Sequence, residues 1–185
     1  GRNSQLYPAL ARVASDLFGI CVVAVDGRAV AVGDAEHEFT IMSVSKPFIF
    51  ALICDLIGAT GARERLGVNA TGYAFNSLAG IERNADGRTN PMVNAGAIAT
   101  TSLVPGENTE AKWRFIQEGL SRFAGRDLAV NEAVYASAQA TNTRNRAIAQ
   151  LLQSYDRLYS SAAEATDLYT RQCSLDVTAH DLAVM

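Results

Sequence analysis

Residues 39–57, FTIMSVSKPFIFALICDLI, place a serine three residues before a lysine at the head of an apolar run. On a helix, residues i and i+3 share a face, so the Ser43 hydroxyl and the Lys46 amine can meet. The residues that follow are apolar nearly all round, which predicts a helix buried inside a domain. Pro47 is compatible with the first turn of that helix, where its missing N–H has no partner.

The chemistry of this stretch depends on the lysine. At the dry head of a buried helix the charged amine loses solvation, so we expect the pKa of Lys46 to fall. Such a lysine can take the proton of Ser43 and make it a nucleophile. The S-x-x-K pattern is weak by itself, and a solvated lysine with Ser43 as a helix cap is the alternative. However, 14 of the 16 basic residues are arginine, and only Lys46 and Lys112 are lysine. Because arginine cannot act as a base, the use of lysine at position 46 favours a catalytic role for Lys46.

Composition limits the class of protein. The 185 residues, 49% of them hydrophobic, suffice for one ordinary domain or two small ones. The net charge is −3, and the charged residues of both signs are scattered along the chain without a basic stripe. This pattern argues against nucleic acid or an anionic membrane as partner. No apolar run reaches the length that spans a bilayer. Cys21, Cys54 and Cys173 lack metal spacing and predict reduced thiols in a cytoplasmic protein. With only His37 and His180, a metal site is not expected.

The coarse pattern predicts helices around one hairpin. Residues 8–17 carry a helical pattern, and residues 18–25 and 28–32 flank an Asp-Gly turn, the signature of a β-hairpin. A hairpin followed by the S-x-x-K helix indicates an α+β arrangement. We expect residues 61–67 to be a short exposed helical turn and residues 69–90 a long loop with a helical piece near Leu78.

The second half reads as helical. Asn90-Pro91 predicts a helix start, and the run PMVNAGAIATTSL contains small residues that allow close backbone approach around Asn94. Asn94 alone reads as a capping or core asparagine. Further helices are expected over residues 110–123, 131–138, 144–152 and 162–173, with a capping box opening a last one at 178–181. The hairpin is then the only clear sheet, and a two-stranded sheet is marginal alone, so strands that would complete it are missing.

Several stretches together resemble the serine-dependent glutaminase family, which has the fold of β-lactamases and penicillin-binding proteins. They are DLFGICVVAVDG, GDAEHEFTIMSVSKPF, NPMVNAGAI (90–98), VYAS…TRNRAIA and YTRQCSLDVT, in matching order and spacing. The resemblance implies an α+β, β-lactamase-like serine hydrolase fold. It also implies hydrolysis of the L-glutamine side-chain amide to glutamate and ammonia through an acyl-enzyme, with no cofactor.

The resemblance also assigns roles to residues. It implies that Ser43 is the nucleophile and Lys46 its base. Asn94 and Asn145 match side chains that hold the amino-acid end of the substrate, and Tyr169 matches a tyrosine beside the nucleophile. These types suit the chemistry, because an amide needs an activated nucleophile and oxyanion donors, one of which the Ser43 N–H can supply. Amide side chains can both donate to and accept from a zwitterion.

The sequence departs from the family pattern at three polar positions. Ala138 stands where the family has a glutamate facing the substrate ammonium, Met42 replaces a glutamine before the nucleophile, and Leu6 replaces a tyrosine, with Tyr7 one place on. We expect these contacts to glutamine to be lost. The family also continues past Met185, so we expect residues 1–185 to be the front part of a single domain, with an unpaired hairpin edge and a tendency to form a dimer or tetramer.

Glutamine hydrolysis in the cytoplasm, with a small amino-acid substrate and no nucleic acid or membrane partner, is therefore the main prediction. Three alternatives remain. In the first, the protein is a related Ser-Lys hydrolase of another amide or ester. In the second, it is a catalytically silent homologue that binds an amino acid or a protein. In the third, it is a helical domain in which S-x-x-K arose by chance.

Overall fold

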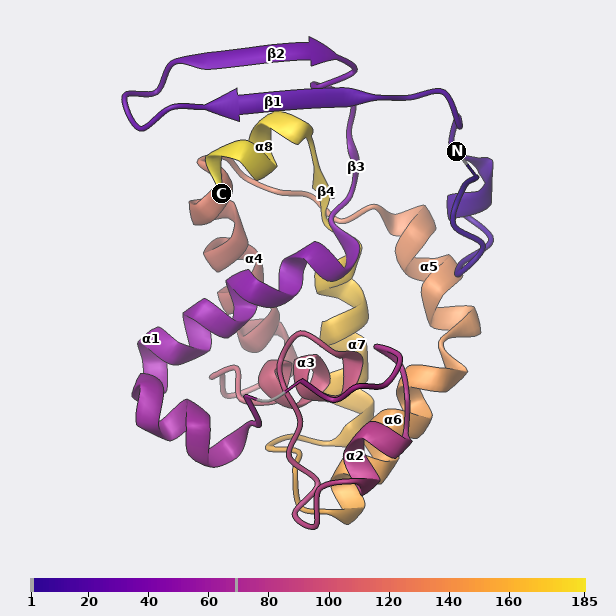
Figure 1. The fold of residues 1–185 in the computed structure, drawn as a ribbon, viewed down its shortest axis with the longest axis vertical. Helices are drawn as coiled ribbons and strands as arrows, with labels where there is room; N and C mark the ends of the chain where they lie inside the picture. Colours follow the sequence, from indigo (N-terminus) through magenta and orange to yellow (C-terminus); the bar gives the residue numbers. More distant parts are fainter. Residues whose placement is uncertain (1, 69) are drawn as a thin grey trace.

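The computed structural model describes residues 2–68 and 70–185, and Figure 1 shows helices packed below a single hairpin. Residue 69, the first of the expected long loop, lies outside the described residues. The elements in chain order are η1 (Leu10–Arg12), β1 (Gly19–Val23), β2 (Ala29–Gly33), β3 (Phe39–Thr40), η2 (Met42–Val44), α1 (Ser45–Arg65), α2 (Ala79–Glu82), α3 (Asn94–Thr101), α4 (Thr109–Ala124), α5 (Glu132–Thr141), α6 (Thr143–Ser154), α7 (Ala162–Cys173), β4 (Asp176–Val177) and α8 (Ala179–Val184).

The hairpin prediction is confirmed. Strands β1 and β2 pair antiparallel, and the turn between them contains Gly27 with a φ of 84°, a conformation that glycine adopts without strain. Helix α8 lies against β1 (Figure 1). On the outer face the cross-strand pairs Ile20–Val32 and Val22–Val30 are exposed by 47–71%. Within the described residues the sheet has only these two strands, so the hairpin carries an uncovered apolar face.

Helix α1 is buried on one face, not all round as its apolar sequence predicted. Ile49 and Ile53 face the core, whereas Leu56 is 48% exposed. The backbone breaks at Gly58 (φ 75°, ψ 162°), and the helix then continues to Arg65, so the separate turn expected at 61–67 belongs to α1. Contrary to the sequence reading, Met42–Arg65 is long and apolar enough to cross a membrane by length and composition. Its buried face packs against α3 and α4.

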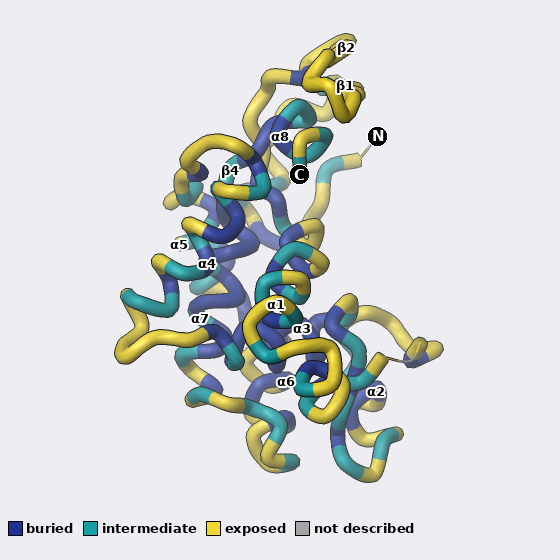
Figure 2. Tube along the Cα trace, turned by 90° about the vertical axis from the view of Figure 1, so that its left-hand side faces the viewer, coloured by how far each residue is buried: buried dark blue, intermediate teal, exposed yellow. Residues whose placement is uncertain are grey.

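The core consists of two apolar clusters that share the long helix α7. One lies among α3, α6 and α7 and includes Ile98 and Ile148, both fully buried. The other joins α1, α4 and the segment around β4 and includes Trp113 and Ile116. Figure 2 shows the buried trace along α3, α4 and α7, with the hairpin exposed at one end. The helices behind the expected site are therefore its rigid support.

Three local predictions differ from the structure. The helix expected at 8–17 is only η1, which buries no residue, so no tertiary packing supports a longer helix. The helix expected from Asn90-Pro91 begins at Asn94, because the Asn90 side chain accepts the Met92 N–H (2.8 Å) and closes a turn. A second sheet, β3 paired with β4, was not predicted, because two-residue strands leave no sequence pattern.

Candidate active site

A strained turn precedes helix α1 and presents Ser43. Met42 has a φ of 50°, in the left-handed region that side chains rarely adopt and that is concentrated at functional sites. Pairing of β3 with β4, together with a 2.8 Å bond from the Ile41 N–H to the Leu175 carbonyl, fixes the strand entering the turn. Ser43 is exposed, whereas Ser45 is completely buried. The structure thus distinguishes the two serines of S-V-S-K, and only Ser43 can meet a substrate.

Lys46 is buried directly behind this turn, with 5% of its surface exposed. Its Nζ donates to Asn94 Oδ1 at 2.8 Å and to the Met92 carbonyl at 3.3 Å, and it lies 5.8 Å from the centre of the Phe75 ring. Burial lowers the pKa of Lys46, and the nearby Cys173 thiol opposes this shift only in part. The expected fall in pKa is therefore present, and it favours the neutral amine that a general base requires.

Asn94, at the start of α3, connects the lysine to the other expected site residues. Its Oδ1 accepts from Lys46 and from the Tyr169 hydroxyl (3.3 Å), and its Nδ2 donates to Asn145 Oδ1 at 2.9 Å. Asn94 and Asn145 are both buried. These bonds fix the orientation of the Asn94 amide and leave one N–H of its Nδ2 for a ligand.

Tyr169 completes the cluster from helix α7. Burial raises its pKa well above the usual range, Cys173 and Tyr7 add to this rise, and a hydrogen bond with Ser43 opposes it. The phenol therefore stays protonated at neutral pH. Hydrogen bonds through Asn94 thus link four of the five residues that the sequence singled out, Lys46, Asn94, Asn145 and Tyr169, and the fifth, Ser43, acts on the pKa of Tyr169.

The structure adds two residues that the sequence reasoning did not place here. Burial raises the pKa of Tyr7 to about 12, and the nearby Cys173 adds to this rise. Tyr7 is 8% exposed, whereas Leu6, which stands at the family's tyrosine position, is 53% exposed. Tyr7 therefore brings a phenol to the cluster. The sequence pointed to Tyr7 only because it directly follows Leu6, which stands at the family's tyrosine position.

Cys173, the last residue of α7, is buried beside the tyrosines, with 7% of its surface exposed. Burial raises the pKa of its thiol to about 11, and the neighbouring Ser45, Tyr169 and Lys46 oppose this rise only in part. A thiol with this pKa stays protonated and is a poor nucleophile. Ala138, at the family's glutamate position, is 1% exposed on α5.

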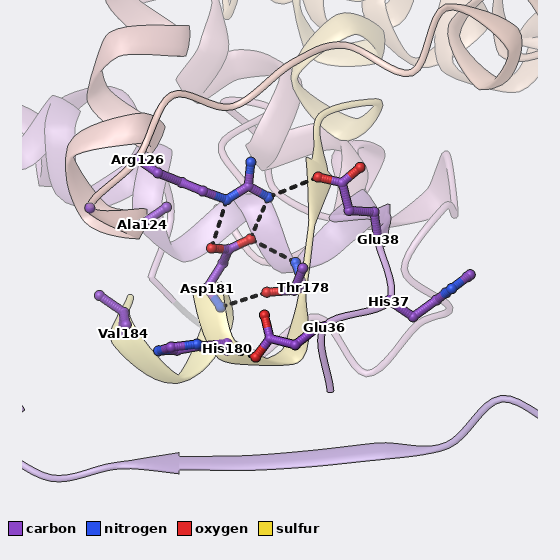
Figure 3. A pocket seen from close by; sticks show the side chains of 10 residues that line it. Glu36, His37, Glu38, Ala124, Arg126, Thr178, His180, Asp181 and Val184 are labelled. Carbon is purple, nitrogen blue, oxygen red and sulfur yellow. Dashed lines mark hydrogen bonds and ion pairs between the residues drawn. The ribbon is translucent and has the colours of Figure 1, made fainter. Parts of the chain in front are cut away.

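A separate polar hollow of about 920 Å³ lies between α8 and the segment before β3. Figure 3 shows the Arg126 guanidinium facing Asp181 and Glu38, with Nη2–oxygen distances of 2.7 and 3.2 Å. His180 and Glu36 approach each other at its other side, at 3.3 Å. None of the residues lining this hollow belongs to the Ser43–Lys46 cluster. The charged groups of this hollow pair with one another, and Asp181 also caps α8, so a structural role explains them.

The amino-acid sequence matches one protein family over its whole length. A family model described as glutaminase matches residues 1–185. Glutaminase 2 of Yersinia pestis is 64% identical over 185 residues, which are all of this chain and 54% of that protein. A glutaminase of Brucella canis is 49% identical over the same residues and is 58% covered. The chain thus spans about half the length of these relatives.

Solved structures show the same similarity. A probable glutaminase, ybaS, superimposes with a TM-score of 0.95 at 40% identity, over 99% of this chain and 59% of that one. A probable glutaminase from Bacillus subtilis, in complex with 6-diazo-5-oxo-L-norleucine, gives a TM-score of 0.87 at 30% identity, over 100% of this chain and 55% of that one. The helix-rich α+β fold described above is shared with the matched parts of these proteins.

Proposed function

The chain belongs to the glutaminase family, and from this premise we propose that the protein hydrolyses the side-chain amide of L-glutamine to L-glutamate and ammonia through an acyl-enzyme on Ser43. One observation carries the proposal. An exposed serine follows a strained turn beside a tyrosine, and behind it a buried lysine with a lowered pKa is held by Asn94.

The first step is proton transfer from Ser43 to neutral Lys46. A neutral amine has two hydrogens, and its two acceptors, Asn94 Oδ1 and the Met92 carbonyl, use both of them. The lone pair is left for the Ser43 proton, so the alkoxide can form as the oxygen attacks the amide carbon. The Ser43 N–H then donates to the oxyanion of the tetrahedral intermediate.

Collapse of that intermediate breaks the C–N bond. The protonated Lys46 returns its proton to the leaving nitrogen, which departs as ammonia and leaves the γ-glutamyl ester on Ser43. Water then attacks the ester, Lys46 takes the water proton and returns it to Ser43, and glutamate is released. The free N–H of Asn94, together with Asn145, holds the amino-acid end of the substrate.

The test uses the electrophilic glutamine analogue 6-diazo-5-oxo-L-norleucine with the full-length protein. We expect peptide mapping to find the adduct on Ser43, and Ser43→Ala to abolish both the adduct and glutamine turnover. Lys46→Arg should be nearly as damaging as Lys46→Ala, because a guanidinium cannot accept the proton. Lys112→Arg is the matched control, because Lys112 is the other lysine of the chain and pairs with Glu164 at 2.6 Å. An adduct on another residue, or undiminished labelling of Lys46→Arg, would contradict the mechanism.

The buried Ala138 favours a second candidate, a Ser-Lys hydrolase of an amide that carries no charged amino group. A buried ammonium without a carboxylate is an uncompensated charge, so glutamine should bind weakly. Ala138→Glu should then raise kcat/KM for glutamine, mainly through KM. If the native protein already turns over glutamine efficiently and Ala138→Glu lowers that activity, another group binds the ammonium and the second candidate fails.

We further propose that the protein is cytoplasmic and forms a homo-oligomer, and that residues 1–185 belong to a single domain. The three free cysteines support a reducing compartment. The exposed pairs Ile20–Val32 and Val22–Val30 support association, because uncovered apolar faces and strand edges promote contacts between chains.

A further inference from the structure

The second serine of S-V-S-K has a defined hydrogen-bonding position behind the first. Ser45 is 0% exposed, and its Oγ donates to the Met42 carbonyl at 2.8 Å. It cannot contact a substrate. Its partner, however, is the carbonyl of the residue immediately before the exposed Ser43.

A buried glutamine fixes the direction of this bond. Gln172, on helix α7, is 1% exposed, and its Nε2 lies 3.3 Å from Ser45 Oγ. An amide NH₂ only donates, so the Ser45 hydroxyl accepts from it and gives its single proton to the Met42 carbonyl. Gln172 Oε1 in turn accepts from Thr101 Oγ1 at 3.0 Å, which anchors the amide to helix α3. A continuous buried chain therefore runs from α3 through α7 to the turn before α1.

The residue at the end of this chain is the one that needs support. Met42 is one of two described non-glycine residues with a positive φ, and such a conformation persists only where the surrounding structure maintains it. A change in the Met42 backbone would rotate the following peptide, and with it the Ser43 N–H and side chain. The bond from Ser45 acts directly on this backbone.

We infer that Ser45 and Gln172 are positioning residues that hold Met42 in its left-handed conformation and thereby set the position of the Ser43 nucleophile. The inference rests on the proposed function, because the position of Ser43 matters only if Ser43 is acylated. Neither residue takes part in the chemistry. Both act through the Met42 carbonyl.

The chain offers a closely matched control at Ser102. Its hydroxyl is also buried (4% exposed), donates to the carbonyl three residues earlier (Ala99, 2.7 Å) and accepts an N–H, from Tyr159 at 3.1 Å. Ser102→Ala therefore removes one donated and one accepted hydrogen bond at the end of α3, as Ser45→Ala does at the start of α1, where Ser45 Oγ also lies 3.9 Å from Cys173 Sγ. A merely structural role for Ser45 predicts the same outcome for both alanine variants.

The experiment measures labelling of the full-length protein by 6-diazo-5-oxo-L-norleucine as a function of analogue concentration. A misplacement of about 1 Å can cost on the order of 100-fold in rate. We expect Ser45→Ala to lower the maximal labelling rate by about 10- to 100-fold, with the half-saturating concentration unchanged. Ser102→Ala should lower Tm similarly but label at the native rate.

Ser45→Thr is the rescue variant. It keeps the hydroxyl, and buried threonines of this chain already donate to carbonyls one turn earlier at 2.6–2.7 Å, namely Thr100, Thr166 and Thr170. We expect Ser45→Thr to recover most of the labelling rate. Native-rate labelling of Ser45→Ala, or equal losses in Ser45→Ala and Ser102→Ala, would overturn the inference.

A crystal structure of Ser45→Ala decides the same question without activity. We expect Met42 to leave the left-handed region in this variant, and a retained φ near 50° would overturn the inference. If the native protein is not labelled at all, the proposed function fails, and the Met42 conformation in Ser45→Ala still tests the hydrogen-bond chain. The two failures are thereby distinguished.

Discussion

Gly96 offers a test of how tightly the backbone around the lysine is packed. A Cβ built at this position in α3 would lie 1.9 Å from the Asn90 carbonyl oxygen and 2.8 Å from the Pro91 nitrogen. Real Cβ contacts are essentially never shorter than 3.0 Å, so Gly96→Ala must displace the turn by about 1 Å. That turn carries the Met92 carbonyl, which accepts from Lys46 Nζ at 3.3 Å. The substitution should therefore act on stability and on the lysine together.

The expected loss of stability follows from two opposing terms. Overpacking costs about 1–3 kcal/mol, and because backbone atoms must move here, we place the cost near the upper end, at about 3 kcal/mol. Alanine in place of glycine inside a helix recovers about 1 kcal/mol. The net loss is then about 2 kcal/mol, which corresponds to a fall in Tm of about 4–8 °C for a chain of this size.

Gly61→Ala is the control, because Gly61 is also helical but its added Cβ would meet only side-chain atoms, of Arg65 and Ile57, at 3.3 and 3.4 Å. We expect this variant to be neutral or stabilised by up to about 1 kcal/mol. Urea unfolding gives the free energies, and labelling by 6-diazo-5-oxo-L-norleucine reports the site. If Gly96→Ala matches Gly61→Ala in stability and labels at the native rate, the close approach of the turn does not position Lys46.

Three further outcomes are expected. The labelling rate should rise with pH to a plateau, because neutral Lys46 is the active form and burial lowers its pKa from 10.5. A labelling rate that does not change with pH, even in acidic solution, would argue against Lys46 as the base. Asp181→Asn should cost about 1 kcal/mol at pH 7. Burial opposes ionisation of Asp181, but hydrogen bonds from Arg126 and the N-cap of α8 outweigh it and lower its pKa from 3.8. This stabilisation is complete above pH 3.8 and is lost as pH falls through the lower folded-state pKa, so urea unfolding should show the two proteins converging in strongly acidic solution. Replacing Val22 and Val30 together by lysine should reduce self-association of this chain in light scattering, and a native chain that is already monomeric would show that the outer hairpin face does not associate.

Elements with strong local signals were predictable from the sequence. Helix α7 begins and ends where its pattern predicted, the capping box of α8 forms, and the Asp-Gly turn joins β1 to β2. Two elements were not predictable for a physical reason. The start of α3 is decided by the side chain of Asn90, which closes a turn instead of capping a helix, and the pairing of β3 with β4 depends on tertiary contacts alone.

The site was predictable in part. The S-x-x-K spacing and the preference for arginine elsewhere identified Lys46 from chemistry, whereas Asn94, Asn145 and Tyr169 depended on the family resemblance. Tyr7 was missed, because its contribution depends on the path of an N-terminal segment that has little regular structure. The role inferred for Ser45 also needed the structure, since only burial separates it from its exposed neighbour.

The pairing of β3 with β4 also limits the order in which parts of the chain can fold during synthesis. The strand leading to Ser43 is fixed by residues 175–177, near the far end of the 185-residue chain. A ribosome that adds about 5–20 residues per second leaves roughly 7–30 s between synthesis of the two partners. During that interval α3 and α4 can already pack against α1, but the strand that leads to Ser43 lacks the partner that fixes it. The proposed nucleophile is positioned only after α7 and β4 have emerged, so a nascent chain stalled before β4 should carry Ser43 without reactivity.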